Sequence, residues 1–170
     1  MPSRLTRLRE LPRDRPLLAL AVAIVGVELL GGSGSLFTAQ GLTGWYYTLQ
    51  QPALSPPGWV FGVVWPVLFA LIGTALWLVW RRIDTAPRRV RTALVVFVIH
   101  FGFNIGWSVV FFGLREIGWG LAVIGGLWLL ILALIWAFGR VDRRAGVLLV
   151  PYFVWVTFAA YLNYQFWVLN

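Results

Sequence analysis

The chain has no cysteine and no lysine, one histidine and only six acidic residues among its 170. The lack of cysteine excludes disulfide bonds, thiolate chemistry and cysteine-based metal sites. A single histidine without an HExxH-type partner indicates no metal site. Charged residues make up 12% of the chain and hydrophobic residues 60%, and a soluble domain of this length needs far more polar surface. We therefore predict an integral membrane protein.

Five long apolar segments lie between the charged clusters. A helix needs about 20 apolar residues to cross the hydrocarbon core, and we assign the spans to residues 17–37, 59–80, 93–114, 119–138 and 147–169. A basic tail (1–16) precedes them, and a loop (38–58) joins the first two. Because the backbone must satisfy its own hydrogen bonds in lipid, we predict an all-α fold: a five-transmembrane-helix bundle in one membrane domain (17–170).

All basic residues are arginine, and their positions alternate with the spans. In the loops after the first and third spans, which lie on one side of the membrane, the only arginine is Arg115. The tail and the loops after the second and fourth spans lie on the other side and hold the remaining 13: Arg4, Arg7, Arg9, Arg13, Arg15, Arg81, Arg82, Arg88, Arg89, Arg91, Arg140, Arg143 and Arg144. The positive-inside rule then predicts a cytoplasmic N-terminus and an outer C-terminus, in a prokaryotic inner membrane. Since topology accounts for the net charge of +8, we expect membrane lipid rather than nucleic acid as a partner.

Few polar residues lie inside the spans. His100, Asn104 and Ser108 follow at i, i+4 and i+8, so they share a face that must turn toward other helices or a cavity. Asn104 either hydrogen-bonds a neighbouring helix or lines a ligand pocket. A lone histidine such as His100 is more often hydrogen-bonded than a haem ligand or a proton-sensitive switch. Glu28 is the one carboxylate within a span, and we expect it to be protonated or paired.

The eleven tryptophans can be explained in two ways. An interfacial aromatic belt explains Trp80, Trp136 and Trp167, but Trp65 and Trp155 lie inside their spans. An aromatic-lined cavity with a few polar groups would suit a flat apolar ligand such as a tetrapyrrole or a sterol-like ring system. The predicted topology places candidates for such a cavity in the outer half of the bundle: Trp45, Trp59, Asn104, Trp107, Trp119, Ala159 and Asn163.

The connection between the first two spans is unusually rigid and aromatic for a plain loop. It contains a Trp-Tyr pair at Trp45 and Tyr46, followed by Pro52, Pro56 and Pro57. Proline fixes the backbone angle φ, which restricts the shapes that the loop can adopt. We interpret this connection as a shaped lid over something flat and apolar.

Together these motifs resemble the TspO/MBR family, which comprises bacterial tryptophan-rich sensory proteins and the mitochondrial translocator protein, or peripheral-type benzodiazepine receptor. The resemblance covers almost everything after the arginine-rich tail. It implies five transmembrane helices, a first loop that closes over the pocket, and frequent dimers, which the glycine-rich faces of spans one and four permit. The motifs that carry it are Trp45-Tyr46, Leu49, Pro52, Pro56-Pro57, Trp59, Phe61, Trp65, Asn104, Trp107, Ser108, Phe111-Phe112, Gly118-Trp119, Pro151-Tyr152, Trp155, Phe158-Ala159, Leu162-Asn163 and Asn170.

The resemblance also implies a function: a membrane sensor that binds porphyrins such as protoporphyrin IX as ligands, without an obligatory cofactor, and responds to stress or light. Transport of porphyrins, lipids or sterols is an alternative. Light-dependent porphyrin degradation is another, because Trp59 and Trp155 resemble the tryptophans implicated in it; otherwise we expect no enzyme. The implied ligand-binding residues are Trp59, Phe61, Asn104, Trp107, Trp119, Trp155, Ala159 and Leu162.

Three positions depart from the family pattern. Gln51 stands in the lid where a basic residue is usual, which weakens a contact with a porphyrin propionate. His100 replaces the usual glutamine and adds a titratable group. The sterol pattern needs a basic residue after Tyr164, and none follows. Although such patterns are weak evidence, this one argues against sterol transport.

Overall fold

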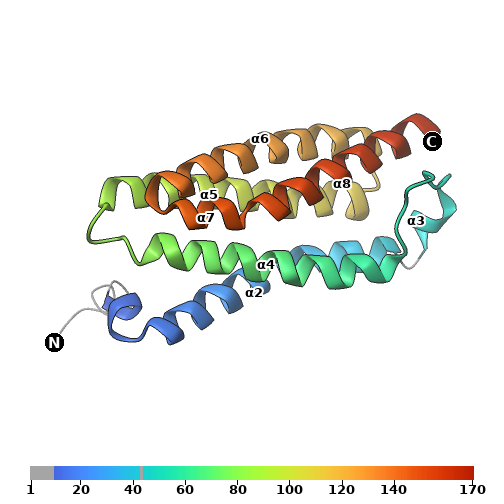
Figure 1. The fold of residues 1–170 in the computed structure, drawn as a ribbon. Coiled ribbons are helices and arrows are strands. Elements are labelled where there is room, and N and C mark those ends of the chain that lie inside the picture. Colours follow the sequence, from blue (N-terminus) through green and yellow to red (C-terminus); the bar gives the residue numbers. More distant parts are fainter. Residues whose placement is uncertain (1–9, 43) are drawn as a thin grey trace.

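The computed structural model describes residues 10–42 and 44–170. Five long helices form an elongated bundle, and the C-terminus lies at the same end as α3 (Figure 1). Five helical segments are long and apolar enough to cross a membrane, which confirms the predicted fold class: Pro16–Leu42, Gly58–Trp80, Pro87–Gly113, Ile117–Val141 and Arg143–Leu169.

The individual elements divide these segments more finely. The long helices are α2 (Pro16–Leu42), α4 (Gly58–Trp80), α5 (Pro87–Ser108), α6 (Ile117–Val141) and α8 (Val150–Leu169). A π-helical turn, η1 (Val109–Gly113), extends α5, and the short helix α7 (Arg143–Leu148) precedes α8. Between α2 and α4 lies one further short helix, α3 (Trp45–Thr48).

Helices α2 and α5 extend furthest beyond their predicted spans. Helix α2 continues to Leu42, which leaves a shorter connection to α4 than residues 38–58. Helix α5 begins at Pro87 instead of residue 93, because proline suits the first helical turn and arginine side chains can reach out to water. In the tail, residues 10–14 are helical and the helix breaks at Arg15, just before Pro16.

The order of neighbours around the bundle differs from the order in the chain. Helix α2 packs mainly on α4 and more lightly on α5 and η1, whereas α6 packs on α5, α7 and α8. The backbones approach closely at Gly73 of α4, where an added Cβ would come within 2.6 Å of the Cα of Ile24 in α2. Small residues permit such approaches in membranes, where van der Waals packing holds helices together. This contact brings the backbones of α2 and α4 close together around Gly73.

Candidate functional site

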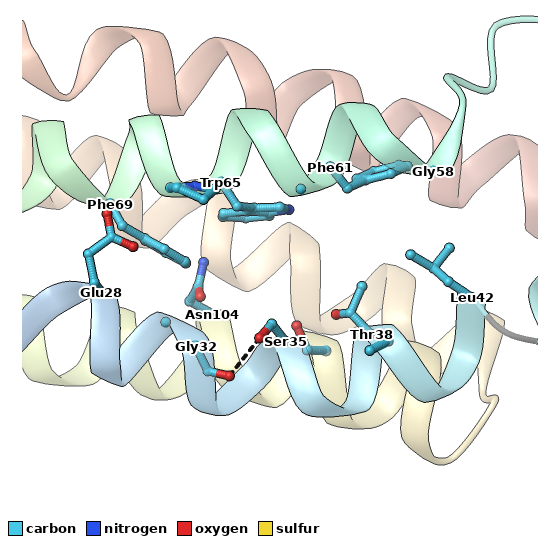
Figure 2. A pocket seen from close by; sticks show the side chains of 15 residues that line it. Glu28, Gly32, Ser35, Thr38, Leu42, Gly58, Phe61, Trp65, Phe69 and Asn104 are labelled. Carbon is cyan, nitrogen blue, oxygen red and sulfur yellow. Dashed lines mark hydrogen bonds between the residues drawn. The ribbon is translucent and has the colours of Figure 1, made fainter.

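A cavity of about 330 Å³ lies between α2, α4 and α5. Its far end holds Glu28, and the end near the α2–α4 connection holds Leu42 and Gly58 (Figure 2). The lining residues are Glu28, Gly31, Gly32, Ser35, Thr38, Ala39 and Leu42 of α2, Gly58, Phe61, Gly62, Trp65, Pro66 and Phe69 of α4, and Asn104 and Ser108 of α5.

Aromatic rings form the α4 wall of this cavity. Phe61, Trp65 and Phe69 recur every four residues, which places them on one face of the helix (Figure 2). The rings of Trp65 and Phe69 lie 5.3 Å apart and are tilted by 31°. Pro66 has no N–H, so the carbonyl of Gly62 loses its helical partner beside the cavity. The wall is therefore apolar and aromatic, with one backbone acceptor nearby.

Small residues form the facing wall on α2. Gly31 lies so close to the ring of Phe69 that an added Cβ would come within 2.2 Å of it. An added Cβ on Gly32, in contrast, would meet nothing within 4 Å. One wall consists of rings and the other mostly of small residues, and the lining runs along α2 from Glu28 to Leu42.

The polar groups of the cavity are few, and one is acidic. Ser35 donates its hydroxyl to the carbonyl of Gly32 at 2.7 Å, within its own helix. Glu28 makes no hydrogen bond or ion pair with the part of the chain that the structure describes. None of the described lining residues is basic. Glu28 is thus a polar group left without a protein partner at one end of the cavity.

Asn104 connects the cavity to a buried hydrogen-bond network. Its Nδ2 donates to the hydroxyl of Tyr152 at 2.8 Å, and the Nε2 of His100 lies 2.9 Å from the same oxygen. With the Asn104 amide donating, the Tyr152 proton is left for His100. His100 and Tyr152 are both 0% exposed. Asn104 therefore lines the cavity and also hydrogen-bonds a neighbouring helix, and His100 is hydrogen-bonded in the core.

Comparison with known proteins decides what this bundle is related to. The profile of the TspO/MBR family matches residues 19–168. The chain belongs to the TspO/MBR family. Membership supports a role as a membrane sensor or translocator.

Curated relatives of this family member come from bacteria, archaea and animals. It is 39% identical to Tryptophan-rich protein TspO of Chlorobaculum tepidum, over 92% of this chain and 99% of the relative. The protein of the same name from Archaeoglobus fulgidus is 36% identical, over 91% and 98%. Translocator protein of Ovis aries is 31% identical, over 86% and 89%. The similarity therefore extends over nearly the whole of each chain.

The residues that the TspO/MBR resemblance assigned to ligand binding divide between three environments. Phe61 and Asn104 line the cavity. Trp59 and Trp119 are each 70% exposed on the outside of the bundle. The other four lie behind or away from the cavity wall: Trp107, Trp155, Ala159 and Leu162.

Three of these residues are buried in the interior of the bundle, and Trp155 is half-buried. Trp107 donates its indole N–H to Asn163 at 3.1 Å, and Asn163 in turn donates to the carbonyl of Ile117 at 2.9 Å. Trp155 contacts Phe61 edge to face, with ring centroids 5.9 Å apart, so it lies behind a lining residue. Ala159 and Leu162 are buried. Asn163 therefore ties α8 to the start of α6 and is not a lining residue of this cavity.

Sequence reasoning left Trp65, Phe69 and the glycine wall out of the site. The spacing of Phe61, Trp65 and Phe69 is visible in the sequence and indicates a shared helix face. Nothing in the sequence indicates that this face turns toward Gly31 and Gly32 of α2, because that depends on which helices become neighbours.

The lid residues lie at the end of the bundle that holds α3 and the C-terminus (Figure 1). Tyr46 is 3% exposed, and its ring lies 5.1 Å from that of Phe166 in α8. Trp45 contacts Phe111 in η1 edge to face at 5.7 Å. Pro52 is buried, and Pro56 and Pro57 lead into α4. The connection is thus packed against the ends of α5 and α8.

Hydrogen bonds hold the rest of this lid. The backbone N–H of Gln50 donates to the side chain of Asn170 at 2.9 Å, and the Asn170 amide donates back to the Gln50 carbonyl at 3.3 Å. The Gln51 amide donates to the carbonyl of Tyr46 at 2.6 Å. The Gln51 side chain therefore braces the lid internally.

Proposed function

We propose that this protein is a membrane sensor that binds a flat, largely apolar tetrapyrrole, of the protoporphyrin IX class, in the cavity between α2, α4 and α5. The observation that carries the proposal is the row of Phe61, Trp65 and Phe69 facing a wall of glycine and other small residues. Aromatic rings stack on flat conjugated ligands in offset or edge-to-face arrangements. Small residues opposite let such a ligand approach closely.

The polar groups of the cavity support one orientation of this ligand. Glu28 lies at the end of the cavity away from the lid, and no basic residue is among the described lining residues. A carboxylate beside another carboxylate in a poorly solvated site is repelled. The propionates of a porphyrin would therefore point toward the lid end, and its apolar edge toward Glu28. Asn104 and Ser108 supply hydrogen bonds at the α5 wall.

Light-dependent breakdown of the bound tetrapyrrole is a second candidate, because an indole lines the cavity. Trp65 would contact the ligand directly, whereas Trp155 lies behind Phe61 and Trp59 faces outward. Dissolved dioxygen would have to be the oxidant, and an indole in contact with the photoexcited ring would exchange an electron with it. The candidate therefore predicts a stronger effect of Trp65→Phe than of Trp59→Phe on light-driven porphyrin loss.

Titration of the detergent-purified protein with protoporphyrin IX in the dark tests the binding proposal. Tryptophan quenching and the porphyrin Soret band report occupancy, and we expect saturation. Gly32→Leu should weaken affinity by about tenfold or more, since a lost contact of about 1.4 kcal/mol corresponds to that factor. Gly26→Leu is the matched control, because neither glycine has a neighbour within 4 Å of an added Cβ and Gly26 does not line the cavity.

Each outcome of this titration decides a separate point. Equal affinities in Gly32→Leu and Gly26→Leu would reject this cavity as the binding site. Absence of saturable binding in the wild type would reject the tetrapyrrole. Illumination of the saturated complex then tests the second candidate, which is rejected when Trp65→Phe and Trp59→Phe lose porphyrin at the wild-type rate.

A further inference from the structure

A second cavity lies at the opposite end of α4 from the lid. Its volume is about 830 Å³, and this open cavity is lined by the end of α4, the end of α6 and helix α7. It shares no lining residue with the cavity between α2, α4 and α5. The lining residues are Leu78, Arg81, Arg82, Val141, Asp142, Arg143, Arg144, Val147 and Leu148.

Four arginines make the lining of this second cavity strongly basic. Arg81 and Arg82 follow the last residue of α4, and Arg143 and Arg144 open α7. The single acidic residue among the described lining residues is Asp142, so four arginines face one aspartate. Asp142 is already engaged, because it accepts from the backbone N–H of Arg144 at 3.0 Å and lies 3.7 Å from Arg82. An excess of positive charge therefore remains for an outside partner.

Apart from the charged residues, the lining of the same cavity is aliphatic, and these aliphatic residues form what we call its floor. Leu78 lies on the last turn of α4, and Val141 on the last residue of α6. Val147 and Leu148 lie on α7, and Val147 is 60% exposed. A partner that fills the cavity must carry negative charge where it meets the arginines and apolar surface where it meets these aliphatic residues. A free phosphate would satisfy the arginines and leave this floor uncovered.

Two arginine–tryptophan pairs indicate where the membrane boundary runs at this end. The guanidinium of Arg81 lies 4.7 Å from the ring centre of Trp77, and that of Arg140 lies 5.5 Å from Trp136. Tryptophan and arginine are enriched at the level of the lipid headgroups, where an apolar ring and a charged group are both satisfied. The arginines of the cavity thus lie at headgroup level, beside its aliphatic lining residues.

We propose that this second cavity is a binding site for one anionic phospholipid. The headgroup phosphate pairs with Arg81, Arg82, Arg143 and Arg144, and the first part of an acyl chain lies on Val147 and Leu148. Basic pockets between transmembrane helices are the usual protein sites for anionic headgroups, and guanidinium groups bind phosphate through paired hydrogen bonds. A zwitterionic lipid fits less well, because its ammonium would enter the same cluster of arginines.

The proposal is tested by native mass spectrometry of the detergent-purified protein with phosphatidylglycerol or phosphatidylcholine of the same acyl chains. We expect one tightly retained phosphatidylglycerol and no comparable phosphatidylcholine. The double variant Arg143→Gln/Arg144→Gln should bind it about 25-fold more weakly, since each basic side chain near an anionic lipid contributes about a factor of five. The Asp142 bond to α7 persists in this variant, because it uses the backbone of Arg144.

A second double variant with the same loss of charge is the matched control. Arg15→Gln/Arg88→Gln removes two exposed arginines of the bundle that do not line the cavity. Equal weakening in the two double variants would overturn the proposal, because it would reduce the effect to net charge. Retention of phosphatidylglycerol in Arg143→Gln/Arg144→Gln would also overturn it.

A further variant separates a lipid from a free anion. Val147→Ser shortens the apolar floor and should weaken phosphatidylglycerol binding, whereas Val150→Ser, outside the cavity, should not. Competition by inorganic phosphate at concentrations that match the lipid would overturn the lipid assignment in favour of a simple anion site. None of these readouts depends on tetrapyrrole binding, so the two proposals fail separately.

Discussion

The polar side chains on the two sides of the bundle differ in how they are paired by hydrogen bonds. On the side of α5, α6 and α8, polar groups pair across helices: His100 and Asn104 with Tyr152, Trp107 with Asn163. Two buried atoms on this side, the Nδ1 of His100 and the Nε1 of Trp155, have no described partner. On the side of α2, the half-buried Glu28 has no described partner, and Ser35 bonds only within its own helix. A polar group without a partner is costly in lipid unless a ligand or water completes it. Glu28 lines the cavity and His100 and Trp155 do not, so the α2 side is where an unpaired polar group can meet a ligand.

The largest expected effect comes from breaking the paired side. Tyr152→Phe removes the hydroxyl that His100 and Asn104 share and leaves both buried groups unsatisfied. We expect a loss of about 2 kcal/mol in the free energy of unfolding. Reversible unfolding in mixed micelles measures it, with Tyr161→Phe, an exposed tyrosine of the same helix, as the control. Equal stability of the two variants would contradict the view that the paired side holds the bundle.

A smaller effect on stability is expected on the unpaired side. Glu28→Gln removes a carboxylate that contacts no described protein partner, so the free energy of unfolding should change by less than about 0.5 kcal/mol. With the propionates at the lid end, protoporphyrin IX affinity should change by less than about fivefold, which corresponds to about 1 kcal/mol. The dark titration measures it, with Glu10→Gln as the control outside the cavity. A much larger gain in affinity would place the propionates beside Glu28.

The smallest effect concerns the lid. Burial raises the pKa of Tyr46 above its ordinary value, so the folded lid favours the neutral phenol. This contribution to stability is fully present below about pH 10, the unfolded value, and is lost as the pH rises through the folded value. Lid docking should therefore loosen in that alkaline range, as measured by proteolysis between α2 and α4. Tyr46→Phe should remove the dependence; an identical alkaline profile in that variant would assign it to another group.

Much of the fold was predictable from the residues alone, and less of the site. The five spans follow from apolar length, and the ends that differed, at Leu42 and Pro87, lie where helices continue beyond the hydrocarbon. Of the eight residues expected to bind ligand, Phe61 and Asn104 line the cavity. Trp59, one of the eight, faces outward, whereas Trp65, which was not among them, lines the wall. Their six-residue separation places them on different faces of α4, and packing decides which face is used.

Composition and apolar length by themselves determined that this chain is a five-helix membrane protein, because each crossing must bury its own backbone hydrogen bonds over a fixed thickness. The motif pattern determined its family. Only the tertiary structure decided that α2 lies against α4 and α5, that Gly31 and Gly32 face an aromatic row, and that four arginines surround one aliphatic floor. The reason is physical: lipid is as apolar as the helix surfaces, so hydrophobicity does not select partners. Shape and a few hydrogen bonds do.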